Sequence, residues 1–196
     1  MDGYGNIMLA GWGTKVPYGV GNTNKLGYLA LIDQYGLPYW VYQAKDNFNG
    51  GDTVCTYISH VTIGSTDFVY GLCNLPRWDL NYVNANFLNS PVIIKLLLSS
   101  GNLQYMAHLP VDGANNMLQN GLFATAETSG ANTIAYAIYR YRHSVGATTQ
   151  VQNFAAVSFN EATLVVQNMN IYFNPDPTAG GLLAQAGAKT TGWYST

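Results

Sequence analysis

Between Asp67 and Ala107 the chain reads as three apolar runs, Phe68-Val-Tyr-Gly-Leu-Cys73, Val92-Ile-Ile-Lys-Leu-Leu97 and Leu103-Gln-Tyr-Met-Ala107. The last two runs are joined by Ser99-Ser-Gly-Asn102, a composition typical of a tight turn. Short runs rich in β-branched and aromatic residues between such turns are typical of β-strands. This part of the chain therefore predicts neighbouring antiparallel strands.

The same alternation of apolar runs and polar turns continues on both sides of this stretch. No part of the sequence shows a sustained helical period, so we predict an all-β protein with a single domain over residues 1–196. Further strands are expected at residues 7–12, 28–32, 37–42, 53–59, 121–126, 133–139, 154–159 and 164–167. Pro38 lacks a backbone donor, which places its strand at a sheet edge or places the residue at a strand start.

Spacing indicates that the strands belong to a repeat. Gly11 and Gly71 are 60 residues apart (71 − 11), and Gly71 and Ala137 are 66 apart (137 − 71). The segment 181–186 matches 121–126 at an offset of 60 (181 − 121). We therefore predict repeated units at about 1–45, 52–110 and 115–170, with a partial fourth at 178–196 that offers a spare first strand.

Two motifs resemble a known repeat family. The pattern Asp2-x-x-Gly5-Asn6-Ile-x-x-Ala-Gly11 and the segment Ser100-Gly-Asn-Leu-Gln-Tyr105 are similar to the SBBP-type β-propeller repeat of bacterial and protist surface proteins. In the third unit Glu161-Ala-Thr163 replaces the Gly-Asn turn, which departs from that pattern. The resemblance implies a propeller-like array of four-stranded antiparallel blades with a structural or interaction role, and it brings no catalytic residues.

The number of units leaves the closure of this array open. Closed propellers usually hold about 4 to 8 blades, whereas this chain encodes three units and a remnant. The chain is therefore an incomplete part of a longer propeller, half of a six-bladed ring closed by two copies, or one element of an open stacked assembly.

Composition limits the possible functions. Charged residues make up 9% of the chain, against roughly 25% in ordinary soluble domains, and the formal net charge is −2. Such a chain is not expected to bind nucleic acid through bulk electrostatics, and no apolar run is long enough for membrane insertion. The polar but weakly charged surface favours an extracellular or cell-surface protein that works with other protein subunits, as a homo-oligomer or within a larger chain.

Cysteine and histidine placement does not predict a metal site, a cofactor or an active site. Cys55 and Cys73 lie nine residues on either side of Gly64, so a hairpin turning there would bring them face to face (64 − 55 and 73 − 64). They are then either a disulfide or two small buried residues in a reducing compartment. The three histidines, His60, His108 and His143, fall in different structural contexts, and no catalytic sequence motif is present. We therefore expect a protein that is not an enzyme.

The long loops are the candidate ligand-binding regions. Aromatic rings beside arginines commonly grip glycans and partner proteins, although such rings also pack down onto the sheets below them. Our leading expectation is a structural or adhesive module that acts through protein contacts, and the alternative is a lectin-like glycan-binding propeller. The candidate ligand-binding residues are Tyr18, Arg77, Trp78, Tyr82, Arg140 and Tyr141.

Overall fold

The computed structural model describes residues 5–14, 25–44, 53–76, 89–110, 121–145 and 149–172, which form eleven strands in three antiparallel sheets. Sheet A has the order β1-β2-β3. Its strands are β1 (Ile7–Thr14), β2 (Lys25–Ile32) and β3 (Pro38–Ala44). Pro38 is thus the first residue of an edge strand, as its missing donor predicts.

Sheets B and C have four strands each. Sheet B runs in the order β4-β5-β6-β7, and sheet C runs in the order β11-β10-β9-β8. The strands of sheet B are β4 (Val54–Ile63), β5 (Thr66–Pro76), β6 (Asn89–Leu97) and β7 (Leu103–His108). Those of sheet C are β8 (Gly121–Ser129), β9 (Asn132–Val145), β10 (Thr149–Asn160) and β11 (Val165–Tyr172).

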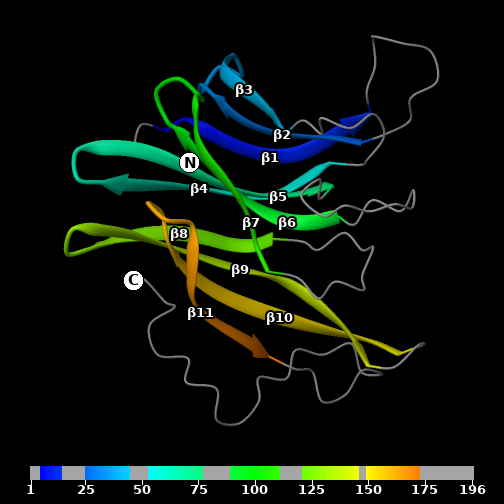
Figure 1. Cartoon of the computed structure of the whole chain (residues 1–196). Coiled ribbons are helices and arrows are strands. Elements are labelled where there is room, and N and C mark those ends of the chain that lie inside the picture. The colour runs from blue at the N-terminus through cyan, green and yellow to red at the C-terminus, as the bar shows by residue number, and fades with distance from the viewer. Residues whose placement is uncertain are drawn as a thin grey trace.

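The sheets are stacked in chain order, with sheet B between the other two (Figure 1). Every predicted strand is found, usually with one to several further residues at its ends, and the all-β prediction is confirmed. Strands β4 and β8 lie side by side across the junction of sheets B and C, and β4 also contacts β1. Each sheet therefore packs face to face against the next one.

The β4–β5 hairpin shows how local sequence sets the register. Ile63 pairs with Thr66, which leaves Gly64 and Ser65 as a two-residue turn. Gly64 has a φ of 63°, a conformation that a tight hairpin turn requires and that glycine adopts without steric cost. The register set by this turn holds as far as Tyr57 opposite Leu72, and a register shift between Cys55 and Tyr57 then brings Cys55 opposite Cys73.

An apolar core lies at each of the two junctions between neighbouring sheets. Between sheets A and B, Leu29, Leu31 and Trp40 pack on residues of β5 and β6, and Trp40 donates its ring N–H to the Leu98 carbonyl at 2.7 Å. Between sheets B and C, large side chains of sheet B such as Tyr70 face small ones of sheet C. The small residues are Ala124, Ala126, Ala135, Ala137 and Ala155. Large-to-small complementarity lets the second pair of sheets approach closely.

Hydroxyl side chains of β4 and the residue before it bond to both neighbouring sheets. Thr53 Oγ1 accepts the Gly27 N–H of sheet A at 2.6 Å. Thr56 and Ser59 donate to carbonyls of β8 in sheet C, at 3.0 Å to Gly121 and 2.6 Å to Ala124. Strand β4 is therefore the element that ties the stack together.

The pairing registers show that the three sheets are built alike. The residues Leu9, Ala30 and Val41 form a cross-strand row in sheet A. The corresponding row in sheet B is Val69, Leu96 and Leu103, and in sheet C it is Ala135, Phe159 and Val166. Gly11, Gly71 and Ala137, whose spacing indicated the repeat, lie on the corresponding strands β1, β5 and β9, each two residues after the row.

Candidate functional site

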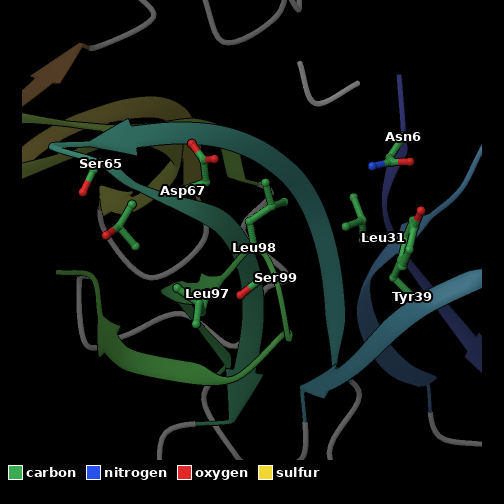
Figure 2. A pocket seen from close by; sticks show the side chains of 9 residues that line it. Asn6, Leu31, Tyr39, Ser65, Asp67, Leu97, Leu98 and Ser99 are labelled. Carbon is green, nitrogen blue, oxygen red and sulfur yellow. The ribbon is translucent and has the colours of Figure 1, made fainter. Parts of the chain in front are cut away.

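A pocket of about 440 Å³ opens between sheets A and B, at the end where the short turns lie. Leu31 of β2, with Leu97 and Leu98 at the end of β6, makes its apolar part. Tyr39 stands on the sheet A side, and Asp67 and Ser99 stand on the sheet B side (Figure 2). Ligand sites commonly combine such an apolar base with a few polar groups.

Asp67 is held rigidly in the wall of this pocket. Its Oδ1 accepts a hydrogen bond from Thr62 Oγ1 at 2.7 Å and lies 2.9 Å from His60 Nε2. The Thr62 hydroxyl, and after it His60, hold the pKa of the Asp67 carboxyl below its ordinary value. The backbone carbonyl of Asp67 also accepts the Leu98 N–H at 3.0 Å, so the carboxylate is fixed at the junction of β5 and β6.

The pocket also carries hydroxyl groups and one exposed aromatic ring. Ser65 and Thr66 come from the β4–β5 turn, and Ser99 comes from the turn after β6. Tyr39 lies on β3 with 63% of its surface exposed. A ring, a carboxylate and several hydroxyls are the groups that hold a polyhydroxylated ligand, because a sugar ring offers both an apolar face and hydroxyl donors.

A second polar cluster is buried between sheets B and C. Lys95 of β6 and Glu161, in the turn after β10, are 2.5 Å apart between Nζ and Oε2, and each side chain is 9% exposed. Tyr105 donates its hydroxyl to Oε1 of Glu161 at 3.1 Å, and Tyr70 donates to the same oxygen. The Lys95 ammonium lies 4.1 Å from the centre of the Phe68 ring.

The tyrosines of this cluster are strongly perturbed. Burial raises the pKa of both Tyr70 and Tyr105, and the negative charge and hydrogen bonding of Glu161 raise them further. Both phenols therefore stay protonated and act as hydrogen-bond donors to one carboxylate oxygen. The cluster as a whole pairs one cation with one anion and surrounds them with aromatic rings.

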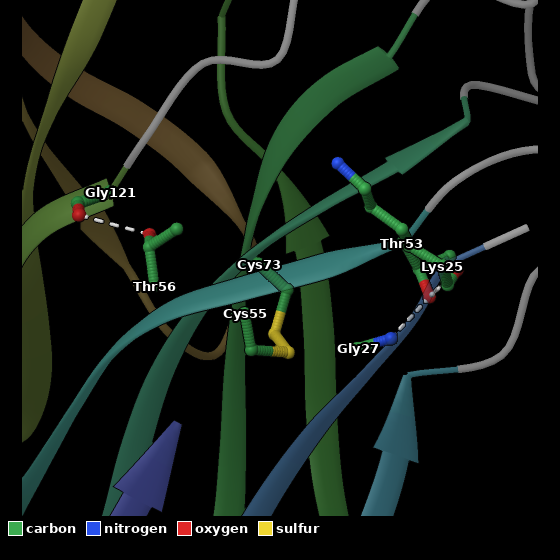
Figure 3. Close-up of a disulfide and its surroundings, with 7 residues drawn as sticks. All are labelled: Lys25, Gly27, Thr53, Cys55, Thr56, Cys73 and Gly121. Atoms are coloured by element: carbon green, nitrogen blue, oxygen red, sulfur yellow. Dashed lines mark hydrogen bonds between the residues drawn. A yellow bond between two sulfur atoms is a disulfide. The ribbon is translucent and has the colours of Figure 1, made fainter. Parts of the chain in front are cut away.

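Cys55 and Cys73 form a disulfide, with their sulfur atoms 2.03 Å apart (Figure 3). Of the two alternatives that the sequence left open, the bonded form is the one present. The bond joins β4 to β5 next to Thr53 and Thr56, whose hydroxyls reach sheets A and C. The strand that ties the stack together is therefore itself fixed covalently to its neighbour.

The structure describes only two of the six predicted ligand-binding residues, Arg140 and Tyr141. Tyr18, Arg77, Trp78 and Tyr82 lie outside the described residues. Arg140 lies on β9 and is partly exposed, and Tyr141 follows it on the same strand, but its side chain is not among those described. Arg140 is not among the residues that line the pocket.

Sequence reasoning missed Lys95, Glu161 and Tyr39. Lys95 is the one charge inside the apolar run 92–97, a signal that could have marked a buried pair. Glu161 falls where the third unit departs from the Gly-Asn turn of the resemblance. Tyr39 carried no such signal, because an aromatic residue on an edge strand is common.

Two searches of the described part of the chain, for a metal-binding cluster and for a membrane-spanning helix, gave no candidate. There, no three His, Cys, Asp or Glu side chains gather in a way that could hold a metal ion. The same residues include no helix with the length and apolarity needed to cross a membrane.

Comparisons with known proteins found no matching family model, no similar curated protein and no similar solved structure. The resemblance to the SBBP-type repeat therefore stays a prediction, based on the motifs in residues 2–11 and 100–105.

Proposed function

We propose that this chain is a non-enzymatic structural or adhesive module, a β-propeller-like array that acts through protein contacts in an extracellular or surface assembly. The observation that carries the proposal is the outer face of sheet A, the face turned away from sheet B. This face is apolar, and in the other two sheets the corresponding face is covered.

The cross-strand rows make the comparison residue by residue. In sheet B, Val69 and Leu96 are fully buried beneath sheet A, and in sheet C, Phe159 is 2% exposed beneath sheet B. In sheet A the same row leaves Leu9 37% and Val41 54% exposed. Sheet A thus presents the surface that accepts a preceding sheet, and among the described residues no sheet covers it.

Sheet A also has one strand fewer than sheets B and C. Sheets B and C begin with β4 and β8, whereas sheet A begins directly with β1, and no described strand pairs with the outer edge of β1. In sequence, residues 181–186 match residues 121–126 at the start of β8, the strand that sheet A lacks. Unpaired edges invite pairing with another strand.

The occupant that fits both features is a second copy of this chain. Its sheet C would cover sheet A, as sheet A covers sheet B. Two copies joined in this way at both ends would give six sheets, within the range of about 4 to 8 blades of closed propellers. The Cys55–Cys73 disulfide supports an oxidising compartment for this assembly.

Light scattering coupled to size-exclusion chromatography tests the proposal. We expect the mass of two chains at micromolar concentration, and the mass of one chain for Val41→Glu. Leu103→Glu is the matched control, because Leu103 is the corresponding residue of sheet B and is 46% exposed. A wild-type protein that stays a single chain up to high concentration would contradict the proposal.

Glycan binding is the second candidate function, and the pocket between sheets A and B favours it. Its ring, carboxylate and hydroxyls, from Tyr39, Asp67, Ser65, Thr66 and Ser99, suit a sugar. We expect a glycan array to give a signal that falls about tenfold or more in Tyr39→Ala, as loss of a stacking ring should cause. Tyr35→Ala is the control, since Tyr35 is 80% exposed and does not line the pocket. A signal unchanged by Tyr39→Ala would reject this site.

A further inference from the structure

We propose that Lys95 and Glu161 are a self-modification site, at which the two side chains condense into an amide bond that joins sheets B and C. Their Nζ and Oε2 atoms are 2.5 Å apart, although the residues are separated by 66 positions in the chain. The carboxyl carbon of Glu161, one bond beyond Oε2, is therefore within contact distance of the amine. Reacting atoms held this close make an otherwise slow condensation effectively intramolecular.

The surroundings favour condensation over a lasting ion pair. Both side chains are 9% exposed, and the Phe68 ring lies 4.1 Å from Nζ. Because the condensation releases water, a site that excludes water also protects the product from hydrolysis.

The step balances without an added reagent. A proton passes from the Lys95 ammonium to Oε2 of Glu161, which leaves an amine with a free electron pair. This pair attacks the carboxyl carbon and forms the C–N bond, and Oε1 carries the negative charge of the tetrahedral intermediate. The C–Oε2 bond then breaks, a second proton from the nitrogen goes to Oε2, and one water molecule leaves. Nothing is oxidised or reduced.

The two phenols are placed to help this step. Tyr105 donates to Oε1 at 3.1 Å and Tyr70 donates to the same atom, and Oε1 is the oxygen on which the negative charge develops. Two fixed donors on a developing oxyanion stabilise the transition state more than the starting acid. A buried ion pair alone does not require two phenol donors on one carboxylate oxygen.

Packing of the sheets does not itself need this pair. Lys95 directly precedes Leu96 of the cross-strand row in sheet B. The residue that directly precedes Ala30 in the row of sheet A is Leu29, which is fully buried in an apolar core. The corresponding residue of sheet C is Ser158. The charged cluster is therefore a feature of the junction between sheets B and C alone among the described sheets.

The intact mass of the full chain tests the proposal. After reduction of the disulfide and denaturation, we expect a mass lower than that of the sequence by one water molecule. Proteolytic digestion should then give a branched peptide that contains both Lys95 and Glu161. A wild-type mass equal to that of the sequence, with the two residues recovered in separate peptides, would overturn the proposal.

Two variants separate the chemistry from packing. Lys95→Met removes the amine and keeps an unbranched apolar side chain, so its mass should equal that of its sequence. Tyr70→Phe keeps the ring but removes one donor to Oε1, and we expect a smaller fraction of cross-linked chains at equal times after refolding. Lys25→Arg, far from the cluster, should cross-link like the wild type. Equal cross-linking rates in Tyr70→Phe and the wild type would reject the role given to the phenol.

Discussion

Loss of Glu161, which removes both the carboxylate partner of Lys95 and the amide bond proposed above, should destabilise the fold. Glu161→Ala would leave the Lys95 ammonium in a site where each side chain is 9% exposed, without its carboxylate partner. Removing one partner of a buried pair costs about 3 to 5 kcal/mol. We expect a decrease of this size in the free energy of unfolding, measured by urea titration at fixed protein concentration.

The double variant Lys95→Leu with Glu161→Ala is the matched comparison. It copies Leu29, the residue at the corresponding position of sheet A, and leaves no charge unpaired. Apolar replacements of buried pairs are often neutral or stabilising, so it should recover at least about 1 kcal/mol relative to Glu161→Ala. A double variant as unstable as the single one would show that the uncompensated charge is not the cause.

Leu164 is strained, because it has a φ of 56° in the turn between β10 and β11. For a residue with a Cβ this left-handed conformation costs roughly 1 to 2 kcal/mol, and glycine occupies it freely. Leu164 is 44% exposed, so little packing is lost on its removal. We expect Leu164→Gly to raise the free energy of unfolding by roughly 0.5 to 1 kcal/mol after the entropy cost of glycine. Leu103→Gly, at the first residue of β7 and without a positive φ to relieve, should lower it.

At the scale of elements, the distance between sheets depends on two glycines. A Cβ on Gly71 would lie 2.3 Å from Leu29 Cδ1 of sheet A, and a Cβ on Gly121 would lie 2.2 Å from Leu72 Cβ of sheet B. Leu29 can rotate its terminal methyl away, whereas Leu72 Cβ moves only with the backbone. We therefore expect Gly121→Ala to cost about 2 to 3 kcal/mol and Gly71→Ala about 1 kcal/mol, by thermal unfolding. The reverse order would contradict this reading of the two contacts.

The strands could be predicted from the sequence because each is a short apolar run between turn residues. Gly64 and Gly101 mark turns that the structure has at those residues, and both have positive φ values, 63° and 69°. Cys55 faces Cys73 as their spacing about Gly64 suggested, but the turn includes Ser65 as well, and a register shift between Cys55 and Tyr57 makes up the difference. These features are local in the chain, which is why periodicity and turn chemistry reveal them.

The candidate sites could not be predicted, because they depend on contacts between sheets. Lys95 and Glu161 meet only when β6 packs against the turn after β10, and Tyr39 and Asp67 line one pocket only because sheets A and B pack together. A single sequence shows which residues share a strand face, but it does not show which faces meet. The loops favoured from composition lie mainly outside the described residues.

For the molecule as a whole, stability should fall at alkaline pH. The pKa values of Tyr70 and Tyr105 are raised above 10.0 in the folded chain, so the unfolded chain ionises these phenols first. Their stabilisation is present below pH 10 and is lost as pH rises above it. We expect the urea midpoint to decrease from pH 9 to pH 11, and to decrease less in Tyr105→Phe. An equal decrease in that variant would assign the effect to other groups, such as Tyr136, whose pKa is raised to about 12.

A head-to-tail arrangement of copies makes a prediction that a face-to-face dimer does not share. The outer face of sheet C includes Asn170, which is exposed on β11 and pairs with Ala156. Val41→Glu should damage the sheet A face, and Asn170→Glu should damage the sheet C face. In a two-copy ring each interface joins the sheet A face of one chain to the sheet C face of the other, so either variant alone has the defect in both interfaces. In a mixture, one interface combines both defects and the other has neither.

We therefore expect each variant alone to run as a single chain in size-exclusion chromatography with light scattering, and an equimolar mixture to regain the mass of two chains. Only a heterologous interface, which joins two different faces, allows this rescue. An isologous contact joins one face to the same face of the second chain, so mixing the two variants could not restore it. Val41→Glu mixed with Leu9→Glu is the matched control, since both changes lie on sheet A and no intact interface can form. Rescue in this control, or none in the first mixture, would rule out the head-to-tail ring.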